Sequence, residues 1–190
     1  MKGNEVKVIQ VLLENKTKDV NINQLAKLLK KDYKNTHNIV KRLEKIQLIT
    51  LEQFGKAYKV KLINKPHPLI IEAEYQRREI LKKKANFRVI INDFKKINEQ
   101  LIVLLFGSHA KGTNTKHSDI DLLIITENEE KISSMIRLYP LDIHPTYVPM
   151  KYFIDMLKSR EFTVVSEAIK NNYIFVGIED YYRLLENVGY

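Results

Sequence analysis

The sequence predicts a chain of two domains, in which a basic helical domain with a β-hairpin precedes an α/β (α+β) domain built on a mixed sheet. Three observations lead to this fold class. Apolar residues recur at helical spacing up to residue 46, and two β-prone runs follow them. The prolines of Lys65-Pro66-His67-Pro68 then interrupt the pattern, and beyond residue 98 buried strands alternate with helices. We therefore expect an N-terminal domain, a helical linker and a C-terminal domain over residues 1–64, 65–98 and 99–190.

Composition excludes several classes of protein. An apolar fraction of 44% and a charged fraction of 29% are typical of a soluble globular chain. Because the chain has no cysteine, it forms no disulfide and has no thiolate zinc site or cysteine nucleophile. No apolar run reaches the ~20 residues that cross a bilayer, and no signal peptide opens the sequence. We therefore expect a cytoplasmic protein with no membrane partner.

Charge is divided unevenly along the chain. Residues 1–98 carry 23 Lys and Arg against 10 Asp and Glu, a net charge of +13. Residues 99–190 carry 9 against 13, a net charge of −4. A basic half favours contact with nucleic acid because it attracts phosphates, and an acidic half favours metal ions. The asymmetry indicates that the two halves have different partners.

The N-terminal half is expected to form three short helices and a hairpin. The first helix covers residues 5–15, the second carries Leu25, Leu28 and Leu29, and Asp32 caps the third. The third helix buries a stripe of five residues, Thr36, Ile39, Val40, Leu43 and Ile46. Two β-prone runs then flank the turn Gln53-Phe54-Gly55-Lys56, and these are Leu48–Glu52 and Ala57–Leu62.

This arrangement of helices and hairpin is characteristic of one DNA-binding family. The stretch LAKLLKKDYKNTHNIVKRLEKIQLI resembles the winged helix-turn-helix family from its second helix to its first wing strand, and the resemblance covers about residues 4–63. It implies double-stranded DNA as a partner, a homodimer on a palindromic site, and contacts from the third helix and the wing. The residues that we assign to DNA binding are Tyr33, Lys34, Asn35, His37, Asn38, Lys41, Arg42, Lys56 and Lys59. The alternative is a protein–protein module, because the same fold also serves as a dimerisation platform.

The linker and the C-terminal half are expected to contain helices and then an alternation of strands and helices. One or two helices cover residues 69–98, with Arg77-Arg78 and Lys82–Lys84 on a solvated face. The continuous apolar run Leu101–Phe106 is typical of a strand buried on both faces. Further strands are expected at Ile120–Thr126, Leu138–Tyr147 and Tyr173–Val176, and helices at Lys151–Lys158, Thr163–Lys170 and Tyr181–Glu186.

Three aspartates of the C-terminal half are candidate metal ligands. Asp119 and Asp121 flank Ile120 on one strand, so their side chains point to the same face, roughly 7 Å apart. Such a pair is costly to desolvate without a cation between the carboxylates, and hard oxygen donors select Mg²⁺ or Mn²⁺. Asp142 lies on the polar face of a later strand and joins the pair if the two strands are neighbours. Two metals held in this way stabilise the attacking and leaving oxygens of a phosphoryl displacement.

A glycine and a serine follow the first apolar strand. Gly107-Ser108 opens a short helix, where glycine lets the backbone approach a phosphate and the helix N-terminus offers free amide protons. Lys111 follows one turn later, within reach of a phosphate oxygen. We assign Gly107, Ser108, Lys111 and Ser118 to nucleotide binding.

The glycine, the serine and two of the aspartates together match one enzyme superfamily. GSHAKGTNTKHSDID resembles the Gly-Ser, ten residues, Asp-any-Asp motif of the polymerase-β-like nucleotidyltransferases, most closely the minimal nucleotidyltransferases. The resemblance implies that Gly107 and Ser108 hold the triphosphate of ATP or another nucleoside triphosphate. It also implies that Asp119, Asp121 and Asp142 are catalytic and hold two Mg²⁺ ions, and that Asp142 helps to deprotonate the acceptor hydroxyl.

The resemblance covers about residues 99–178, and the sequence departs from the family at two positions. His109 stands where these proteins often have arginine, and Lys111 replaces a second frequent arginine. Lysine lacks the planar guanidinium of arginine, and histidine is mostly neutral at pH 7. We therefore expect the affinity for the triphosphate to be lower than in family members with arginine, or tuned to a different value. We expect His109 and His117 to be solvated, whereas His144 either orients Asp142, contacts the acceptor or lies free at the surface.

These observations favour an enzyme that transfers AMP from ATP to a hydroxyl acceptor. Small nucleotidyltransferases of this kind resemble the antitoxin halves of toxin–antitoxin pairs, which implies a toxin-like partner protein as acceptor. The competing hypothesis is a DNA-binding transcription regulator whose nucleotidyltransferase domain senses nucleotide or dimerises without catalysis. A third hypothesis is an RNA or tRNA nucleotidyltransferase, which the small catalytic domain disfavours.

Overall fold

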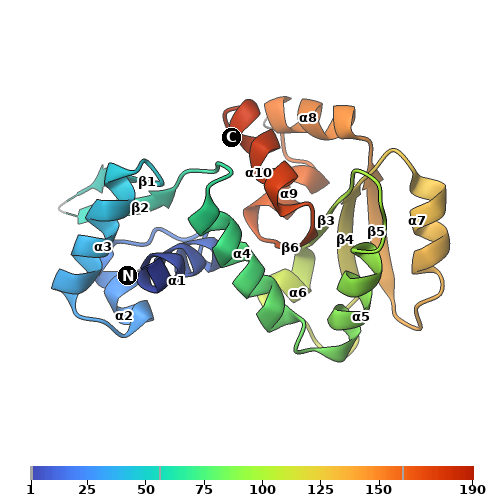
Figure 1. The fold of residues 1–190 in the computed structure, drawn as a ribbon, viewed down its shortest axis with the longest axis horizontal. Helices are drawn as coiled ribbons and strands as arrows, with labels where there is room; N and C mark the ends of the chain where they lie inside the picture. The colour runs from blue at the N-terminus through green and yellow to red at the C-terminus, as the bar shows by residue number, and fades with distance from the viewer. Residues whose placement is uncertain (1, 56, 160) are drawn as a thin grey trace. The chain divides into compact units, whose positions relative to one another are not determined.

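The computed structural model describes residues 2–55, 57–159 and 161–190 (Figure 1). The chain divides into two compact units after Arg77, within helix α4 (Pro68–Leu81). The domain boundaries expected from the sequence, after residues 64 and 98, stay predictions. No helix among the described residues is long and apolar enough to span a membrane.

The first unit contains three helices followed by a two-stranded antiparallel hairpin. Its elements before α4 are α1 (Lys2–Glu14), α2 (Ile22–Leu29), α3 (Tyr33–Lys45), β1 (Ile49–Phe54) and β2 (Ala57–Leu62). These are the element types, in the order, that the apolar spacing predicted. Asn21 and Gln24 form a capping box at the start of α2, and Asp32 Oδ1 accepts the amide proton of Asn35 at 2.8 Å at the start of α3.

The buried stripe of α3 is confirmed except at its last residue. Thr36, Ile39, Val40 and Leu43 are buried, as their spacing predicted. Ile46 was expected to be the fifth, but 46% of its surface is exposed. The reason is that α3 ends at Lys45, so Ile46 follows the helical repeat and does not continue it.

Two arginines of α4 contradict the expectation of a solvated face. Arg77 and Arg78 are only 2% and 6% exposed. Arg77 Nη1 donates to Glu74 Oε2 at 2.6 Å in the first unit, and Arg78 Nη1 donates to the carbonyl of Phe175 at 3.0 Å in the second. Buried charged groups need such partners, and a charge run alone does not reveal that they exist.

The second unit is built on a four-stranded mixed sheet with the strand order β5-β4-β3-β6 (Figure 1). The strands are β3 (Ile102–Leu105), β4 (Ile120–Ile125), β5 (Ile143–Val148) and β6 (Tyr173–Val176). β3 pairs antiparallel with β4 and β6, whereas β4 and β5 are parallel. Since β3 is central, all four of its side chains are buried, as its continuous apolar sequence predicted. β5 is an edge strand, which explains how it accommodates Pro145.

Helices complete the second unit. They are α5 (Ala85–Phe94), α6 (Gly107–Lys111), α7 (Glu129–Ile136), α8 (Met150–Ser159), α9 (Val164–Lys170) and α10 (Ile178–Asn187). The helix α7 was not expected, because its three apolar residues, Ile132, Met135 and Ile136, lie in a segment of only eight residues. The strand expected from Leu138 begins only at Ile143, since the residues before it form turns after α7 and Leu138 is 81% exposed.

Candidate active site

The pairing of β4 with β5 brings the predicted aspartates to neighbouring strand ends. In the parallel register Ile120 lies opposite Ile143, and Asp121 lies opposite His144. Just before the strands, the Ile120 amide donates to the carbonyl of Asp142 at 2.8 Å. Residues opposite each other in a parallel pair share a face, so the side chains of these two acidic segments meet on one side of the sheet.

Two aspartates and one histidine form a compact cluster there. His144 Nδ1 lies 3.4 Å from Asp119 Oδ2, and His144 Nε2 lies 3.6 Å from Asp142 Oδ1. One ligand atom from each residue lies within 4.8 Å of the others. Around an ion with bonds of about 2.1 Å, neighbouring ligand atoms are roughly 3 Å apart and opposite ones roughly 4 Å. The kinds of donor fit a divalent cation, and their spacing is slightly wider than the spacing of ligands around a bound ion.

Asp121 is set apart from this cluster and lies against a glycine. The Phe106 amide donates to the carbonyl of Asp121 at 3.0 Å, which holds the start of α6 beside β4. Gly107 has a φ of +66°, and a β-carbon built on it would lie 2.0 Å from Asp121 Oδ2. Glycine is thus required twice, by the backbone angle and by the approach of the carboxylate.

Asp121 has a raised pKa. Burial of the carboxylate is the main cause of this rise. The charges of Asp119 and Glu167 raise the pKa further, whereas His144 and His109 lower it. Burial and like charges disfavour an ionised carboxylate, whereas a cation beside it favours ionisation. The environment of Asp121 is therefore one that a bound cation would relieve.

The other residues assigned to nucleotide binding lie around α6. Ser108 is half-buried on α6, and its carbonyl accepts the amide protons of Gly112 and Thr113. Lys111 Nζ lies 2.9 Å from Glu167 Oε1 on α9. Ser118 Oγ accepts the amide proton of Thr115 at 2.9 Å, so this hydroxyl closes the loop that leads to β4.

Glu167 and His109 are two neighbours of the site whose positions sequence reasoning missed. Glu167 comes from α9, and neither its spacing nor its local sequence connects it to Asp121. His109 was expected to be solvated, but its ring packs edge-on against Phe87 at 5.5 Å. Its Nε2 lies 3.2 Å from the carbonyl of Ser118, and its Nδ1 is buried without a hydrogen-bond partner in the described part of the chain. The short helix α6 turns the ring toward α5, which the linear motif does not reveal.

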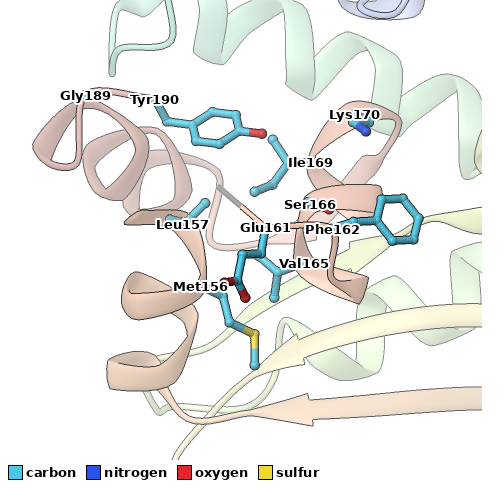
Figure 2. Close-up of a pocket in the computed structure, with 10 residues that line it drawn as sticks. All are labelled: Met156, Leu157, Glu161, Phe162, Val165, Ser166, Ile169, Lys170, Gly189 and Tyr190. Carbon is cyan, nitrogen blue, oxygen red and sulfur yellow. The ribbon is translucent and has the colours of Figure 1, made fainter. Parts of the chain in front are cut away.

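A separate cavity of about 440 Å³ lies between α8, α9 and residues 189–190 (Figure 2). Its wall is mostly apolar, and the 83% exposed side chain of Phe162 lies beside it with Lys170 Nζ 5.5 Å from the ring centre. The described residues that line it include none of those predicted to bind metal or nucleotide. The acidic cluster is therefore not part of this cavity.

The residues assigned to DNA binding lie mainly on the exposed face of α3. Those that are exposed are Tyr33, Lys34, Asn35, Asn38 and Lys41, while His37, Arg42 and Lys59 are half-buried. Three of the cations already have an acidic partner: the pairs are Lys41 with Glu44, Arg42 with Glu5, and Lys59 with Asp19. Lys56 lies outside the described residues.

Comparison with known families gives two matches. A model described as a nucleotidyltransferase domain matches residues 87–185, just over half of the 190-residue chain, including α6, β4, β5 and α9. A second model, described only as HVO_A0114, matches residues 1–63. Comparison with curated proteins and with solved structures found no match.

Proposed function

The chain belongs to the nucleotidyltransferase domain family, and from this premise we propose that it transfers a nucleoside monophosphate, AMP from ATP, to a hydroxyl acceptor with Mg²⁺. The observation that carries the proposal is the convergence of carboxylates at one edge of the sheet. Asp119 and Asp142 belong to a cluster that fits a divalent cation, and Asp121 lies against Gly107 at the start of α6. Nucleotide and metal would thus meet at the same edge of the sheet.

In this proposal each residue has a distinct task. Asp119, Asp121 and Asp142 would hold two divalent cations, which supply positive charge to the phosphates and lower the pKa of the attacking hydroxyl. Gly107 and Ser108 bind the triphosphate through backbone amides and the hydroxyl, as glycine at a helix start allows.

The transfer itself is an in-line displacement. The acceptor oxygen forms a bond to the α-phosphorus, the bond from that phosphorus to the bridging oxygen breaks, and pyrophosphate leaves. Asp142 takes the proton of the acceptor hydroxyl. Its carboxylate is suited to this task because it is the more exposed of the cluster's two carboxylates, so an incoming hydroxyl has access to it.

The proposed acceptor is a partner protein with an accessible hydroxyl side chain, as in the toxin partners of antitoxin-type enzymes. The test is to incubate purified protein with Mg²⁺, α-labelled ATP and a lysate of its own cell. A labelled band that is sensitive to protease identifies a protein acceptor, and one that is sensitive to ribonuclease identifies an RNA acceptor. If no band is labelled while the protein binds ATP, catalysis of this kind is ruled out.

The pair of Lys111 and Glu167 leads to a prediction about nucleotide affinity. If Lys111 binds a triphosphate oxygen, Glu167 competes with the nucleotide, because the two side chains are paired at 2.9 Å. We expect Glu167→Gln to bind ATP about 2- to 5-fold more tightly and Lys111→Ala about 10-fold more weakly, as measured by calorimetry with Mg²⁺ present. The effect of Glu167 is small because both side chains are partly solvated.

The matched control for this prediction is Glu99→Gln. It breaks another exposed pair of the second unit, between Glu99 and Lys131 on α7. This variant is expected to leave ATP affinity unchanged. Equal affinities for all of these variants would remove Lys111 from the nucleotide site.

A second candidate function, a DNA-binding regulator, is favoured by the exposed basic face of α3. Its outward residues belong to a unit with a large excess of positive charge, and the first unit has the helix order of a winged helix-turn-helix domain. In this proposal a homodimer binds double-stranded DNA. The two functions are compatible, since they use different units of the chain.

Removal of two lysines from α3 tests this second function. We expect Lys34→Ala with Lys41→Ala to weaken binding to a DNA duplex by about 10-fold and to reduce the slope of log K against log salt by roughly two. The control, Lys7→Ala with Lys18→Ala, removes two exposed lysines from the same unit and changes the net charge equally. If both variants weaken binding to the same extent, α3 does not contact DNA.

A further inference from the structure

The ring of His144 lies between the two carboxylates that are assigned to metal binding. Its nitrogens face Asp119 at 3.4 Å and Asp142 at 3.6 Å. Both separations exceed the ~2.7–3.2 Å of a usual hydrogen bond. Within the described residues no hydrogen bond holds this ring. The ring is therefore within ion-pair distance of both carboxylates, and one ligand atom from each of the three residues lies within 4.8 Å of the others.

The position of the ring follows from the strand register. His144 lies opposite Asp121 in the parallel pair, two residues beyond Asp142, so alternation brings its side chain to the acidic face. At 61% exposure it keeps access to solvent and to ions.

An imidazole nitrogen changes which cation such a site prefers. Mg²⁺ is a hard ion that prefers oxygen ligands and gives up its water with reluctance. Transition-metal ions accept imidazole readily and tolerate mixed oxygen and nitrogen ligands. A cluster of two carboxylates and one imidazole thus differs in chemistry from one made of three carboxylates.

We propose that His144 is the third ligand, with Asp119 and Asp142, of one divalent cation, and that its nitrogen makes this site prefer Mn²⁺ to Mg²⁺. The inference rests on the proposed function in one respect, the assignment of these aspartates to metal. Asp121, which lies against Gly107, is outside this three-residue set and stays assigned to the second cation of the proposed function. The site leaves positions open for water or for phosphate oxygens.

Binding of Mn²⁺ to the full chain, with no nucleotide present, tests the proposal directly. Pulsed electron paramagnetic resonance of bound Mn²⁺ is expected to detect the nuclear modulation of a directly bonded nitrogen. That modulation should be lost in His144→Ala and kept in the control His117→Ala, which alters an exposed loop histidine. In calorimetry, His144→Ala should bind Mn²⁺ about 10-fold more weakly and Mg²⁺ within about 2-fold of the original affinity.

A second variant covers the case in which His144→Ala does not fold. His144→Asn offers an oxygen in place of the nitrogen, so it should lose the nitrogen modulation and the preference for Mn²⁺ while it retains Mg²⁺. Absence of nitrogen modulation from bound Mn²⁺ in the unaltered chain would overturn the proposal, as would failure of the chain to bind Mn²⁺. Equal losses of Mn²⁺ and Mg²⁺ affinity in both variants would overturn it too.

The metal test and the transfer test fail independently. Labelling of an acceptor by a chain whose Mn²⁺ has no bonded nitrogen would keep the proposed function and reject His144 as a ligand. Nitrogen modulation in a chain that labels nothing would keep His144 as a ligand and reject the proposed transfer.

Discussion

Replacement of Asp119 and Asp121 by asparagine is expected to reduce nucleotidyl transfer by about 10³-fold or more and to leave the fold intact. The two carboxylates lie at the start of β4, where in the proposed function each contributes negative charge toward a cation. Asparagine keeps the size of the side chain but removes that charge, so the charge stabilisation that a metal offers, worth several kcal/mol, is lost. The measurement is the amount of label transferred from α-labelled ATP by each protein.

The same double variant separates transfer from the other proposed activity. Its thermal unfolding is expected to occur at or slightly above the original temperature, because Asp121 already has a raised pKa through burial. Binding to DNA is expected to be unchanged, since the variant leaves α3 untouched. Transfer that persists at the original rate in a chain without these carboxylates would refute their assignment to metal.

Gly107→Ala is expected to lower transfer by about 10²-fold and to destabilise the second unit by about 1–3 kcal/mol. The new methyl group would lie 2.0 Å from Asp121 Oδ2, and the φ of +66° is unfavourable for any residue with a β-carbon. Either Asp121 or the start of α6 must move. Both groups belong to the proposed site, so the loss of activity should exceed what the loss of stability explains.

Gly112→Ala is a matched control for this effect. Gly112 has nearly the same backbone angle, a φ of +70°, but apart from its chain neighbours no atom of the described residues lies within 4 Å of the position of its β-carbon. We expect the Gly112→Ala variant to lose about 1 kcal/mol of unfolding free energy through backbone strain and to keep most of the transfer activity. The rates of the two variants, measured well below their unfolding temperatures, isolate the contact with Asp121. Similar rates for both would mean that backbone strain alone determines the outcome.

Local sequence patterns predicted the elements whose residues interact mainly with their neighbours in the chain. The buried strand β3, the cap of α3 by Asp32 and the buried stripe of α3 all depend on residues a few positions apart. Periodicity and capping are physical properties of a single segment, so they can be recognised without the rest of the fold. The helix α7 was missed although Ile132, Met135 and Ile136 have helical spacing, because a segment of eight residues is short for a periodicity signal.

Local sequence patterns did not predict the burial of Arg77 and Arg78. A run of cations normally indicates a solvated face, and nothing in α4 itself says otherwise. The partner of Arg78 is the carbonyl of Phe175, which lies far away in the sequence on β6. Only the folded chain reveals that a buried acceptor is available to it.

The amino-acid sequence was enough to recognise the family motif and to predict that Asp119 and Asp121 share one face, because side chains alternate along a strand. Tertiary structure alone decided that β5 pairs with β4 in a register that brings His144 between Asp119 and Asp142. It also decided that Glu167 reaches Lys111 from α9. Pairing partners and register are long-range properties set by packing of the whole sheet, so no local spacing specifies them.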